Sequence, residues 1–402
     1  MRFLLLAGAA LLILAGGQPA RTSGPLVVRD KDTVLIPATQ EDKWGYVDRS
    51  GRWVIPPQFY EASQFSEGLA AVVPFGSGFF KWGYIDRKGQ WSIRPQFTIA
   101  GSFFEGRARA SVGEGEKLKY GFIDKQGKWI IPARFDDASD FHEGLARVNV
   151  GGKRETDGGN YRLEGGRWGY VDTTGLLAIE PQFDSAYDFS EGLALVIKDH
   201  MWKYIDRTGK AVIELSYPAA KVFSAESFSE GLAAVRTDEG AGWKTAYIDT
   251  TGKTVIEPQR FYGENFSEGL AAVTVDDKVG YIDKTGKIVI TPHFAEAGRF
   301  REGLARVRLE KTVPWWGRGD RWGYIDKTGA LAIPATFNQA GDFVGGVALV
   351  HVGGELKEYA VHQPPAWVGG QWWLIDKQGK AISKNPSEGP AAADPKIPEK
   401  TQ

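Results

Sequence analysis

A short motif of the form aromatic-Gly-Tyr-Ile/Val-Asp-x-x-Gly recurs nine times in this chain, and no other feature constrains the fold as strongly. Each copy keeps its aspartate and the glycine three residues later. The aspartates are Asp48, Asp86, Asp124, Asp172, Asp206, Asp249, Asp283, Asp326 and Asp376. A recurring unit of this length is typical of repeat proteins, in which each unit buries its apolar face against its neighbours.

A second motif, Phe-x-Glu-Gly-Leu-Ala, divides each unit into two halves. Its glycine follows the aspartate by 20 residues in seven of eight copies, as from Asp48 to Gly68, and by 25 residues from Asp206 to Gly231. The stretch from this glycine to the next aspartate varies between 14 and 30 residues. We therefore expect the constant half to be packed and the variable half to form surface loops.

The local sequence predicts strands and not helices. Large side chains alternate in the segment 44–48, and the segment 53–56 is rich in aromatic and β-branched residues before it reaches a proline. Between them, an aspartate followed by a glycine three residues later is typical of a type I turn with a glycine bulge. A third strand, Leu69–Val72, is expected to pair with the next Trp-Gly-Tyr strand, with the variable stretch as the hairpin tip.

The predicted fold class is all-β, a tandem repeat of about nine three-stranded units. We expect an open solenoid or superhelix of hairpins, because nine units exceed the roughly four to eight blades of a β-propeller. A closed propeller is the alternative. The phenylalanines of segments such as Phe59-x-x-Ala62-x-x-Phe65 are expected to form the shared core, in a helical turn or a looped crossing.

Three regions are expected along the chain. Residues 1–20 resemble a signal peptide, with Arg2 before the apolar stretch Leu4–Leu14, which is too short to span a bilayer comfortably. An uncleaved N-terminal anchor is the alternative. Residues 21–383 form the repeat array, and residues 384–402, rich in Pro, Ala, Lys and Glu, are expected to be disordered. The protein is thus predicted to be exported, periplasmic or extracellular, with no transmembrane segment after the signal peptide.

The composition argues against several classes of function. The formal net charge of -1 does not favour nucleic-acid binding, which needs a basic surplus. The absence of cysteine excludes disulfides, thiolate metal sites and cysteine nucleophiles. Five histidines occupy unlike repeat positions, and no phosphate loop, dinucleotide fingerprint or serine-nucleophile elbow occurs. We therefore expect no enzyme, with no catalytic residue, cofactor or metal site.

Three long hairpin tips are predicted, at about residues 149–167, 309–321 and 352–371. The last two are rich in tryptophan, whose faces stack well on sugars or on protein partners. The candidate partner-binding residues are Trp315, Trp316, Arg318, Trp367 and Trp372. The alternative is that these tryptophans fold back over the adjacent unit.

The combined pattern, seen at Lys43–Asp48, Gly51, Ile55-Pro56, Phe59 and Phe65–Ala70, resembles the bacterial WG-repeat family, also called KWG repeats, over about residues 26–383. This resemblance implies an interaction module without catalytic residues to transfer. Copies depart from the pattern at Tyr120, Lys203, Thr245, Ala246, Gly345, Trp373 and Leu374. We expect a non-catalytic scaffold for protein–protein interaction, and carbohydrate or peptidoglycan binding through the Trp-rich tips is the alternative.

Overall fold

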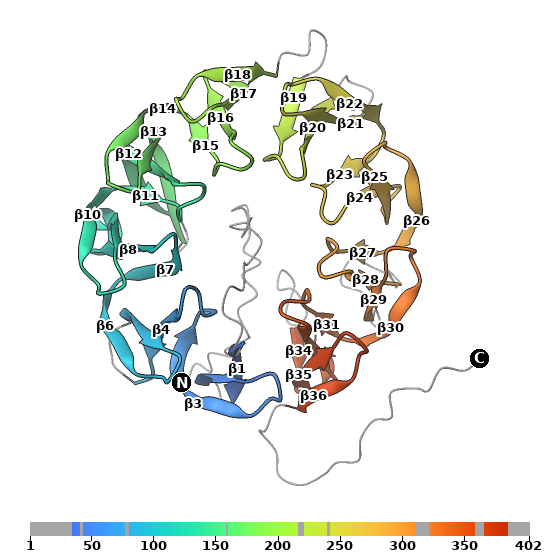
Figure 1. Cartoon of the computed structure of the whole chain (residues 1–402), viewed down its shortest axis with the longest axis horizontal. Coiled ribbons are helices and arrows are strands. Elements are labelled where there is room, and N and C mark those ends of the chain that lie inside the picture. Colours follow the sequence, from blue (N-terminus) through green and yellow to red (C-terminus); the bar gives the residue numbers. More distant parts are fainter. Residues whose placement is uncertain are drawn as a thin grey trace.

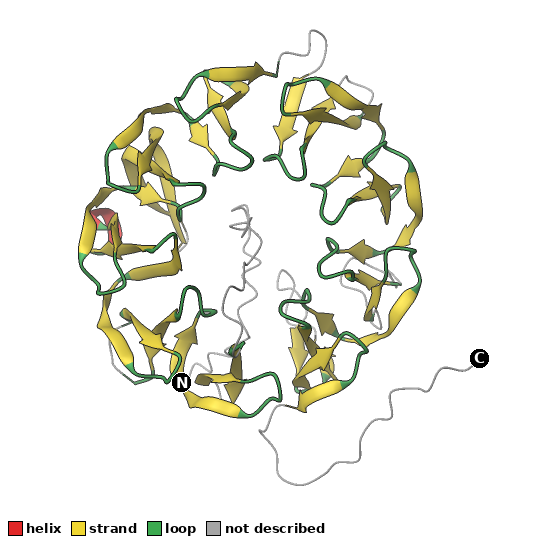
Figure 2. Cartoon of the chain, viewed as in Figure 1, coloured by secondary structure: helices red, strands yellow, loops and turns green. Residues whose placement is uncertain are grey.

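The structure, a computed structural model of the 402-residue chain, is a ring of small antiparallel sheets (Figures 1 and 2). It describes residues 34–40, 43–76, 80–157, 160–215, 221–238, 242–309, 321–357 and 366–384. Within these ranges the only helix is the 3-10 helix η1 (Gly115–Lys117). The predicted signal peptide, and the predicted tail after Lys384, lie outside the described residues.

The first half of the ring is built from four sheets. A six-stranded sheet contains β1 (Ile36–Gln40), β2 (Lys43–Val47), β3 (Trp53–Ala62), β4 (Leu69–Pro74), β5 (Trp82–Asp86) and β6 (Trp91–Phe97). Three four-stranded sheets follow: β7 (Ile99–Phe104), β8 (Arg107–Val112), β9 (Lys119–Ile123) and β10 (Trp129–Phe135); β11 (Asp137–Ala138), β12 (Leu145–Asp157), β13 (Asn160–Asp172) and β14 (Leu177–Phe183); β15 (Ser185–Ala186), β16 (Ala194–Lys198), β17 (Met201–Ile205) and β18 (Ala211–Glu214).

Four more four-stranded sheets complete the ring. They contain β19 (Lys221–Ala225), β20 (Leu232–Asp238), β21 (Trp243–Asp249) and β22 (Thr254–Gln259); β23 (Tyr262–Gly263), β24 (Leu270–Val275), β25 (Lys278–Asp283) and β26 (Ile288–Phe294); β27 (Glu296–Ala297), β28 (Ala305–Arg308), β29 (Trp322–Ile325) and β30 (Leu331–Phe337); β31 (Gln339–Ala340), β32 (Val347–Val352), β35 (Gln371–Asp376) and β36 (Ala381–Lys384). A two-stranded sheet, β33 (Glu355–Lys357) with β34 (Ala366–Val368), extends the last hairpin.

Units two to nine each contribute four antiparallel strands to this ring, and not the predicted three. The first strand is often two residues long and lies toward the centre, as β15 does, and the fourth lies at the outer wall, as β18 does (Figure 1). We number the units one to nine by their aspartates, from Asp48 to Asp376. Unit one begins at β1, which pairs with β2 as β4 pairs with β5, so its first described strand occupies the second position of a unit.

Antiparallel order gives the ring two different faces. The Glu-Gly turns between first and second strands emerge on the same face as the Asp turns between third and fourth strands, and we call this the turn face. The variable tips between second and third strands emerge on the opposite face, together with the connections from one unit to the next. We call this opposite face the tip face.

The all-β prediction is confirmed, but the expectation of an open solenoid is wrong. The eight sheets form a closed β-propeller, the alternative, with β36 beside the first sheet (Figure 1). The expectation failed because it assumed one sheet for each repeat. Strand β3 runs without a break from the outer wall of unit one into unit two, so two units share a sheet. Closure also removes the exposed end surfaces that an open array would present to solvent.

The Asp turn has the predicted geometry. In unit one, the Gly51 amide donates to the Asp48 carbonyl at 2.9 Å, and the Ser50 amide donates to the Asp48 carboxylate at 2.9 Å. Gly51 has a φ of 76°, in the left-handed region that suits glycine. Because the carboxylate is used inside its own turn, the nine aspartates are explained as turn residues.

The glycine of the Trp-Gly-Tyr motif permits a bulge in the outer strand. A Cβ atom on Gly169 would lie 2.5 Å from the Ile179 carbonyl oxygen, closer than such atoms approach. Trp168 pairs with Phe183, and Tyr170 pairs with Ile179. The outer strand therefore advances four residues while its partner strand advances two, which defines the bulge. In unit five, where Lys203 replaces the glycine, β17 and β18 pair more regularly.

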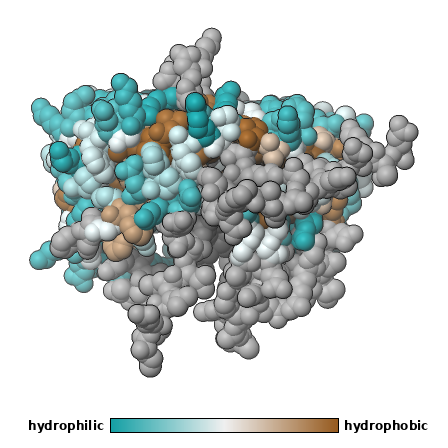
Figure 3. All heavy atoms as spheres, turned by 90° about the horizontal axis from the view of Figure 1, so that it is seen from below, coloured by the Kyte–Doolittle hydropathy of each residue, from teal (hydrophilic) through white to brown (hydrophobic). Residues whose placement is uncertain are grey.

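Among the residues that the structure describes, the core forms eight clusters, each of which joins two consecutive units. In one of them Tyr170 and Phe183 of unit four pack with Phe189 and Ile205 of unit five. Of the predicted core phenylalanines, Phe59 is buried and Phe65 is partly buried, and they lie in a strand and a loop and not in a helical turn. Apolar side chains of the outer strands, among them Val54 and Leu331, also reach the surface of the wall (Figure 3).

Replacing the motif glycine is expected to destabilise the ring. Gly169→Ala should lower the free energy of unfolding by about 2 kcal/mol, because the new methyl group meets backbone atoms that side-chain motion cannot clear. Ala246→Gly, at the same repeat position in unit six, is the matched control and should cost less than about 1 kcal/mol. Urea unfolding measures both, and equal losses would contradict this account.

Candidate functional site

The predicted partner-binding residues are only partly placed by the structure. Trp315, Trp316 and Arg318 lie outside the described residues. Trp367 belongs to strand β34, and its side chain is not described. Trp372 is half-buried in β35.

Trp372 pairs across the sheet with His351, and their ring centroids are 5.1 Å apart. Burial lowers the pKa of His351. Part of the Trp372 ring is therefore used in packing.

The glutamates of the Glu-Gly turns connect one unit to the next on the turn face. Glu67 has a φ of 50°, and its carboxylate accepts the Gly106 amide of the following unit at 3.0 Å. Lys125 donates to the Glu67 carbonyl at 2.9 Å and its ammonium lies 3.3 Å from the carboxylate. The left-handed backbone costs about 1–2 kcal/mol, which a charge-assisted hydrogen bond of similar size offsets.

The same contact recurs around the ring. The later glutamate-to-glycine pairs are Glu105–Gly144, Glu143–Gly192, Glu191–Gly231, Glu230–Gly269, Glu268–Gly303 and Glu302–Gly346, at 2.9–3.0 Å. Arg207, Lys284, Lys327 and Lys377 repeat the role of Lys125. The recurrent carboxylates of the second motif are therefore occupied by the neighbouring unit.

Unit nine shows how the ring closes. Gly345 stands in the position of the glutamate, and a Cβ atom on it would lie 3.3 Å from Val34 and 3.5 Å from the Arg49 guanidinium of unit one. Arg49 follows Asp48 as Arg207 follows Asp206, and each of these arginines lies beside the Glu-Gly turn of the preceding unit. The contact that closes the ring, between unit nine and unit one, thus brings together the same repeat positions as the contacts between internal units.

The tyrosine of the Trp-Gly-Tyr motif forms a second link to the next unit. The Tyr170 hydroxyl donates to the Tyr187 carbonyl at 2.7 Å, and burial raises the pKa of Tyr170. Equivalent bonds at 2.7–2.8 Å are made by Tyr46, Tyr84, Tyr204, Tyr247, Tyr281 and Tyr324. Unit nine has Leu374 in this position, and its next neighbour, unit one, has no first strand among the described residues.

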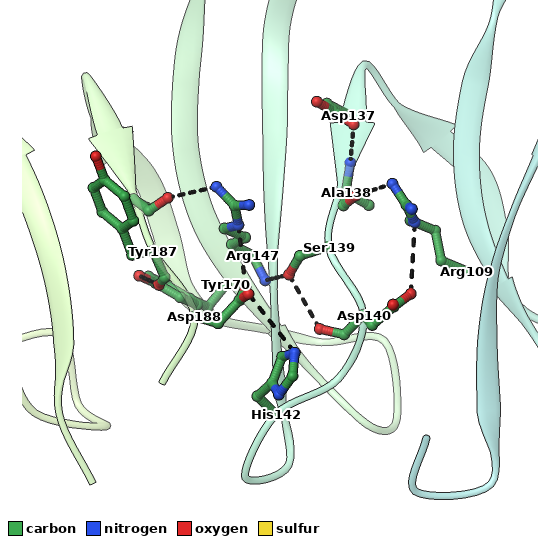
Figure 4. A network of polar contacts seen from close by, with 11 residues as sticks. Arg109, Asp137, Ala138, Ser139, Asp140, His142, Arg147, Tyr170, Tyr187 and Asp188 are labelled. Carbon is green, nitrogen blue, oxygen red and sulfur yellow. Dashed lines mark hydrogen bonds and ion pairs between the residues drawn. The ribbon is translucent and has the colours of Figure 1, made fainter. Parts of the chain in front are cut away.

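Arginine–aspartate pairs add a third link in some units (Figure 4). Arg147 of unit four reaches two groups of unit five. Its Nε lies 3.1 Å from the Asp188 carboxylate, and its Nη1 donates to the Ala186 carbonyl at 2.7 Å. The guanidinium also lies over the Trp168 ring, 5.2 Å from its centroid.

Two other units repeat this link. Arg109 pairs with Asp140 and Arg306 with Asp342 in the same way. Burial raises the pKa of Asp140, and the nearby Arg109 opposes this shift. The arginine in Gly-x-Ala-Arg is the sequence signal that the predictions missed.

Within the described ranges, no group of three or more His, Asp or Glu side chains is placed to hold a metal ion. No helix in the described part of the chain is long and apolar enough to cross a membrane.

The longest described tip, in unit four, is a β-ribbon and not an irregular loop. Strands β12 and β13 pair from Leu145 with Asp172 to Asp157 with Asn160. Gly151, Gly165 and Gly166 have φ between 68° and 85°, so the ribbon bends at its base. Unit nine repeats this device, with positive φ at Gly353, Gly354, Gly369 and Gly370. These paired Gly-Gly dipeptides are a second signal that the sequence predictions missed.

The bent ribbon is fastened toward unit three. Arg154 donates to the Asp136 carbonyl at 2.9 Å, and its guanidinium lies 5.4 Å from the centre of the Tyr120 ring. The Gly151 amide donates to the Asp136 carboxylate at 2.8 Å. The base of this ribbon therefore lies against residues of unit three.

An open hollow of about 620 Å³ lies beside the base of this ribbon on the tip face. Its lining is Asp137, Leu163, Gly165, Gly166, Arg167, Trp168, Asp184 and Ser185. Arg167 and Asp184 form an ion pair across the boundary between units four and five. The hollow thus combines one aromatic ring, two carboxylates and a guanidinium.

Removing one tyrosine hydroxyl is expected to weaken the contact between two units. Tyr170→Phe should lower the free energy of unfolding by about 1–2 kcal/mol, because the Tyr187 carbonyl loses its buried donor. Tyr60→Phe, which alters a tyrosine that is 43% exposed, should change it by less than about 0.5 kcal/mol. Chemical denaturation measures both variants, and no loss for Tyr170→Phe would count against this link.

Acid is expected to destabilise the Asp turns. A hydrogen bond from a Ser or Thr side chain two residues on is the largest cause that lowers the carboxyl pKa. This holds for Asp48, Asp172, Asp206, Asp249, Asp283 and Asp326. An aspartate whose pKa is lower in the folded state stabilises the folded protein at pH values above its unfolded-state pKa, which is about 3.9. This stabilisation is lost as the pH falls through the folded-state pKa.

The urea midpoint should therefore fall when the pH drops below about 4. Thr328→Ala removes the strongest of these bonds at Asp326, and should make the fall less steep. A midpoint that stays constant or rises in acid would contradict the role assigned to these carboxylates.

Comparison with known structures gives distant similarities. Apo AztD from Citrobacter koseri is 15% identical with a TM-score of 0.36, over 74% of this chain and 92% of that one. Pyrococcus horikoshii acylaminoacyl peptidase is 10% identical with a TM-score of 0.36, and the match covers 88% of this chain and 53% of the peptidase. The WD40 propeller domain of Doa1 is 13% identical with a TM-score of 0.29, over 71% and 92% of the two chains. No curated protein sequence matches the chain.

The repeat itself matches a known family. The family described as "WG containing repeat" matches eight segments, 44–73, 82–115, 120–153, 168–202, 204–240, 246–278, 280–312 and 322–355. These segments correspond to units one to eight, and together they cover more than half of the chain. The protein belongs to the WG-repeat family.

Proposed function

We propose that this propeller is a non-catalytic scaffold that binds another protein through its tip face. The observation that carries the proposal is the division of labour between the two faces. On the turn face, the recurrent Glu, Lys and Tyr groups are occupied by contacts between units. The tips differ in length from unit to unit, which is the variation expected of a binding surface on a rigid frame.

The described tips range from very short to long. Unit five turns at Asp199-His200 and unit seven at Asp276-Asp277, whereas unit four extends its ribbon to residue 157. A partner on the tip face would meet side chains that differ around the ring. Because the tip face differs from unit to unit, it favours one orientation of a specific partner. The turn face presents nearly the same pattern from every unit and would not distinguish one orientation from another.

The N-terminal sequence supports export of this scaffold to the periplasm or the cell exterior. Arg2 precedes the apolar stretch Leu4–Leu14, a pattern typical of a signal peptide. The near-balance of charge, with a formal net charge of -1, supports a protein partner over a nucleic acid.

Site-specific photocrosslinking in cells tests which face binds. A photoreactive amino acid at the tip-face positions Lys153, Asp199 or Asp276 should give a discrete crosslinked protein, identified by mass spectrometry. Thr208 and Thr285, exposed on the turn face, are the matched controls and should give none. Crosslinks that arise from the turn-face positions alone would contradict the proposal.

A further inference from the structure

We propose that the hollow beside Trp168 binds a neutral oligosaccharide. This site is distinct from the tryptophans singled out in the sequence and goes beyond the scaffold role. Its volume, about 620 Å³, falls within the usual range of roughly 300–1,000 Å³ for ligand sites. It opens on the tip face, where the base of the unit-four ribbon meets the connection into unit five.

The aromatic wall of the hollow is held in place. Trp168 is half-buried and borders the hollow, while the Arg147 guanidinium lies 5.2 Å from its ring centroid. Arg147 is itself fixed by the Asp188 carboxylate at 3.1 Å and the Ala186 carbonyl at 2.7 Å. An aromatic ring fixed in this way forms a flat apolar surface on which the C–H face of a sugar ring packs without ordering a mobile side chain.

The polar lining suits hydroxyl groups. One oxygen of the Asp137 carboxylate already accepts the Ala138 amide, which leaves the other for a ligand, and the Ser185 hydroxyl both donates and accepts. Both Asp184 oxygens are engaged, one by Arg167 and one by the Asp199 amide, and this ion pair still offers N–H donors and a second lone pair on each oxygen. Sugar hydroxyls also donate and accept, so neighbouring hydroxyls match this mixture. The absence of side chains at Gly165 and Gly166 brings the backbone close to the ligand.

The charge of the lining selects among ligand classes. The lining holds the carboxylates of Asp137 and Asp184 and the guanidinium of Arg167, and the Arg147 guanidinium packs on Trp168, so the charges balance. A phosphate, a nucleic acid or an acidic glycan would meet the two carboxylates without a net positive charge to offset its own. An apolar peptide segment would bury Asp137 and the Arg167–Asp184 ion pair without offering them hydrogen bonds, at a cost in desolvation. A neutral sugar avoids both penalties.

The bend of the ribbon explains why the site lies in unit four. The Gly-Gly pairs direct the ribbon toward Tyr120 of unit three, where Arg154 holds it. Trp202 occupies the repeat position of Trp168 in unit five, where the tip is a tight turn at Asp199-His200 and no ribbon borders the ring. Its ring stacks on Tyr187, with centroids 6.4 Å apart.

Isothermal titration calorimetry of the full chain with neutral trisaccharides of glucose and of N-acetylglucosamine tests the site. At least one trisaccharide should bind, and Trp168→Ala should weaken that binding about tenfold or more. Trp202→Ala is the matched control and should leave the affinity within about twofold. Because Trp168→Ala also removes packing with Arg147, Asp137→Asn provides a second variant, for which a similar loss is expected.

Three results would overturn the proposal. They are the absence of binding by any trisaccharide of the panel, equal weakening by Trp168→Ala and Trp202→Ala, and an unchanged affinity in Asp137→Asn when Trp168→Ala does not fold. Binding of short peptides with the same dependence on Trp168, in place of the sugars, would also overturn it and assign the hollow to a protein partner.

Discussion

The hydrogen bonds that each unit sends forward onto the backbone of the next unit are the interaction on which this structure depends. A single unit of four short strands cannot bury its own aromatic residues, so its stability comes from contact with its neighbour. The carboxylate of Glu143 and the hydroxyl of Tyr170 both reach backbone groups of unit five. They fix the orientation of one unit on the next, and repetition of that orientation curves the array into a ring.

The departures of unit nine fit this constraint. Unit nine has Leu374 in place of the tyrosine and Gly345 in place of the glutamate. Its next neighbour is unit one, which begins in the described chain at Val34, directly before its second-position strand. The sequence before Asp48 has no Glu-Gly motif, so the unit that follows unit nine around the ring offers no Glu-Gly turn to receive a glutamate at position 345. Gly345 instead leaves room for Val34 and Arg49 at the closure.

Local features of the fold could be predicted from the sequence, and features of closure could not. The turn at Asp48, the strands around it and the burial of Phe59 follow from local pattern and hydrophobicity. Whether the array closes depends on the small rotation between one unit and the next, and the sequence of a single unit does not reveal that rotation. The glycine of the Trp-Gly-Tyr motif was expected to belong to a strand, but its role comes from a carbonyl ten residues further on. The hollow beside Trp168 also escaped prediction, because it joins two units across a bent ribbon.

Closure itself is tested most directly by distance measurements between spin labels on the turn face. The chain has no cysteine, so labels at Ser50 and Gln378 would report the separation of units one and nine without background. Labels at Thr285 and Thr328, at the same repeat position in the adjacent units seven and eight, provide the internal reference. A closed ring predicts that the two pairs give similar distances by double electron–electron resonance. A far longer distance between residues 50 and 378 would contradict closure and the account built on it.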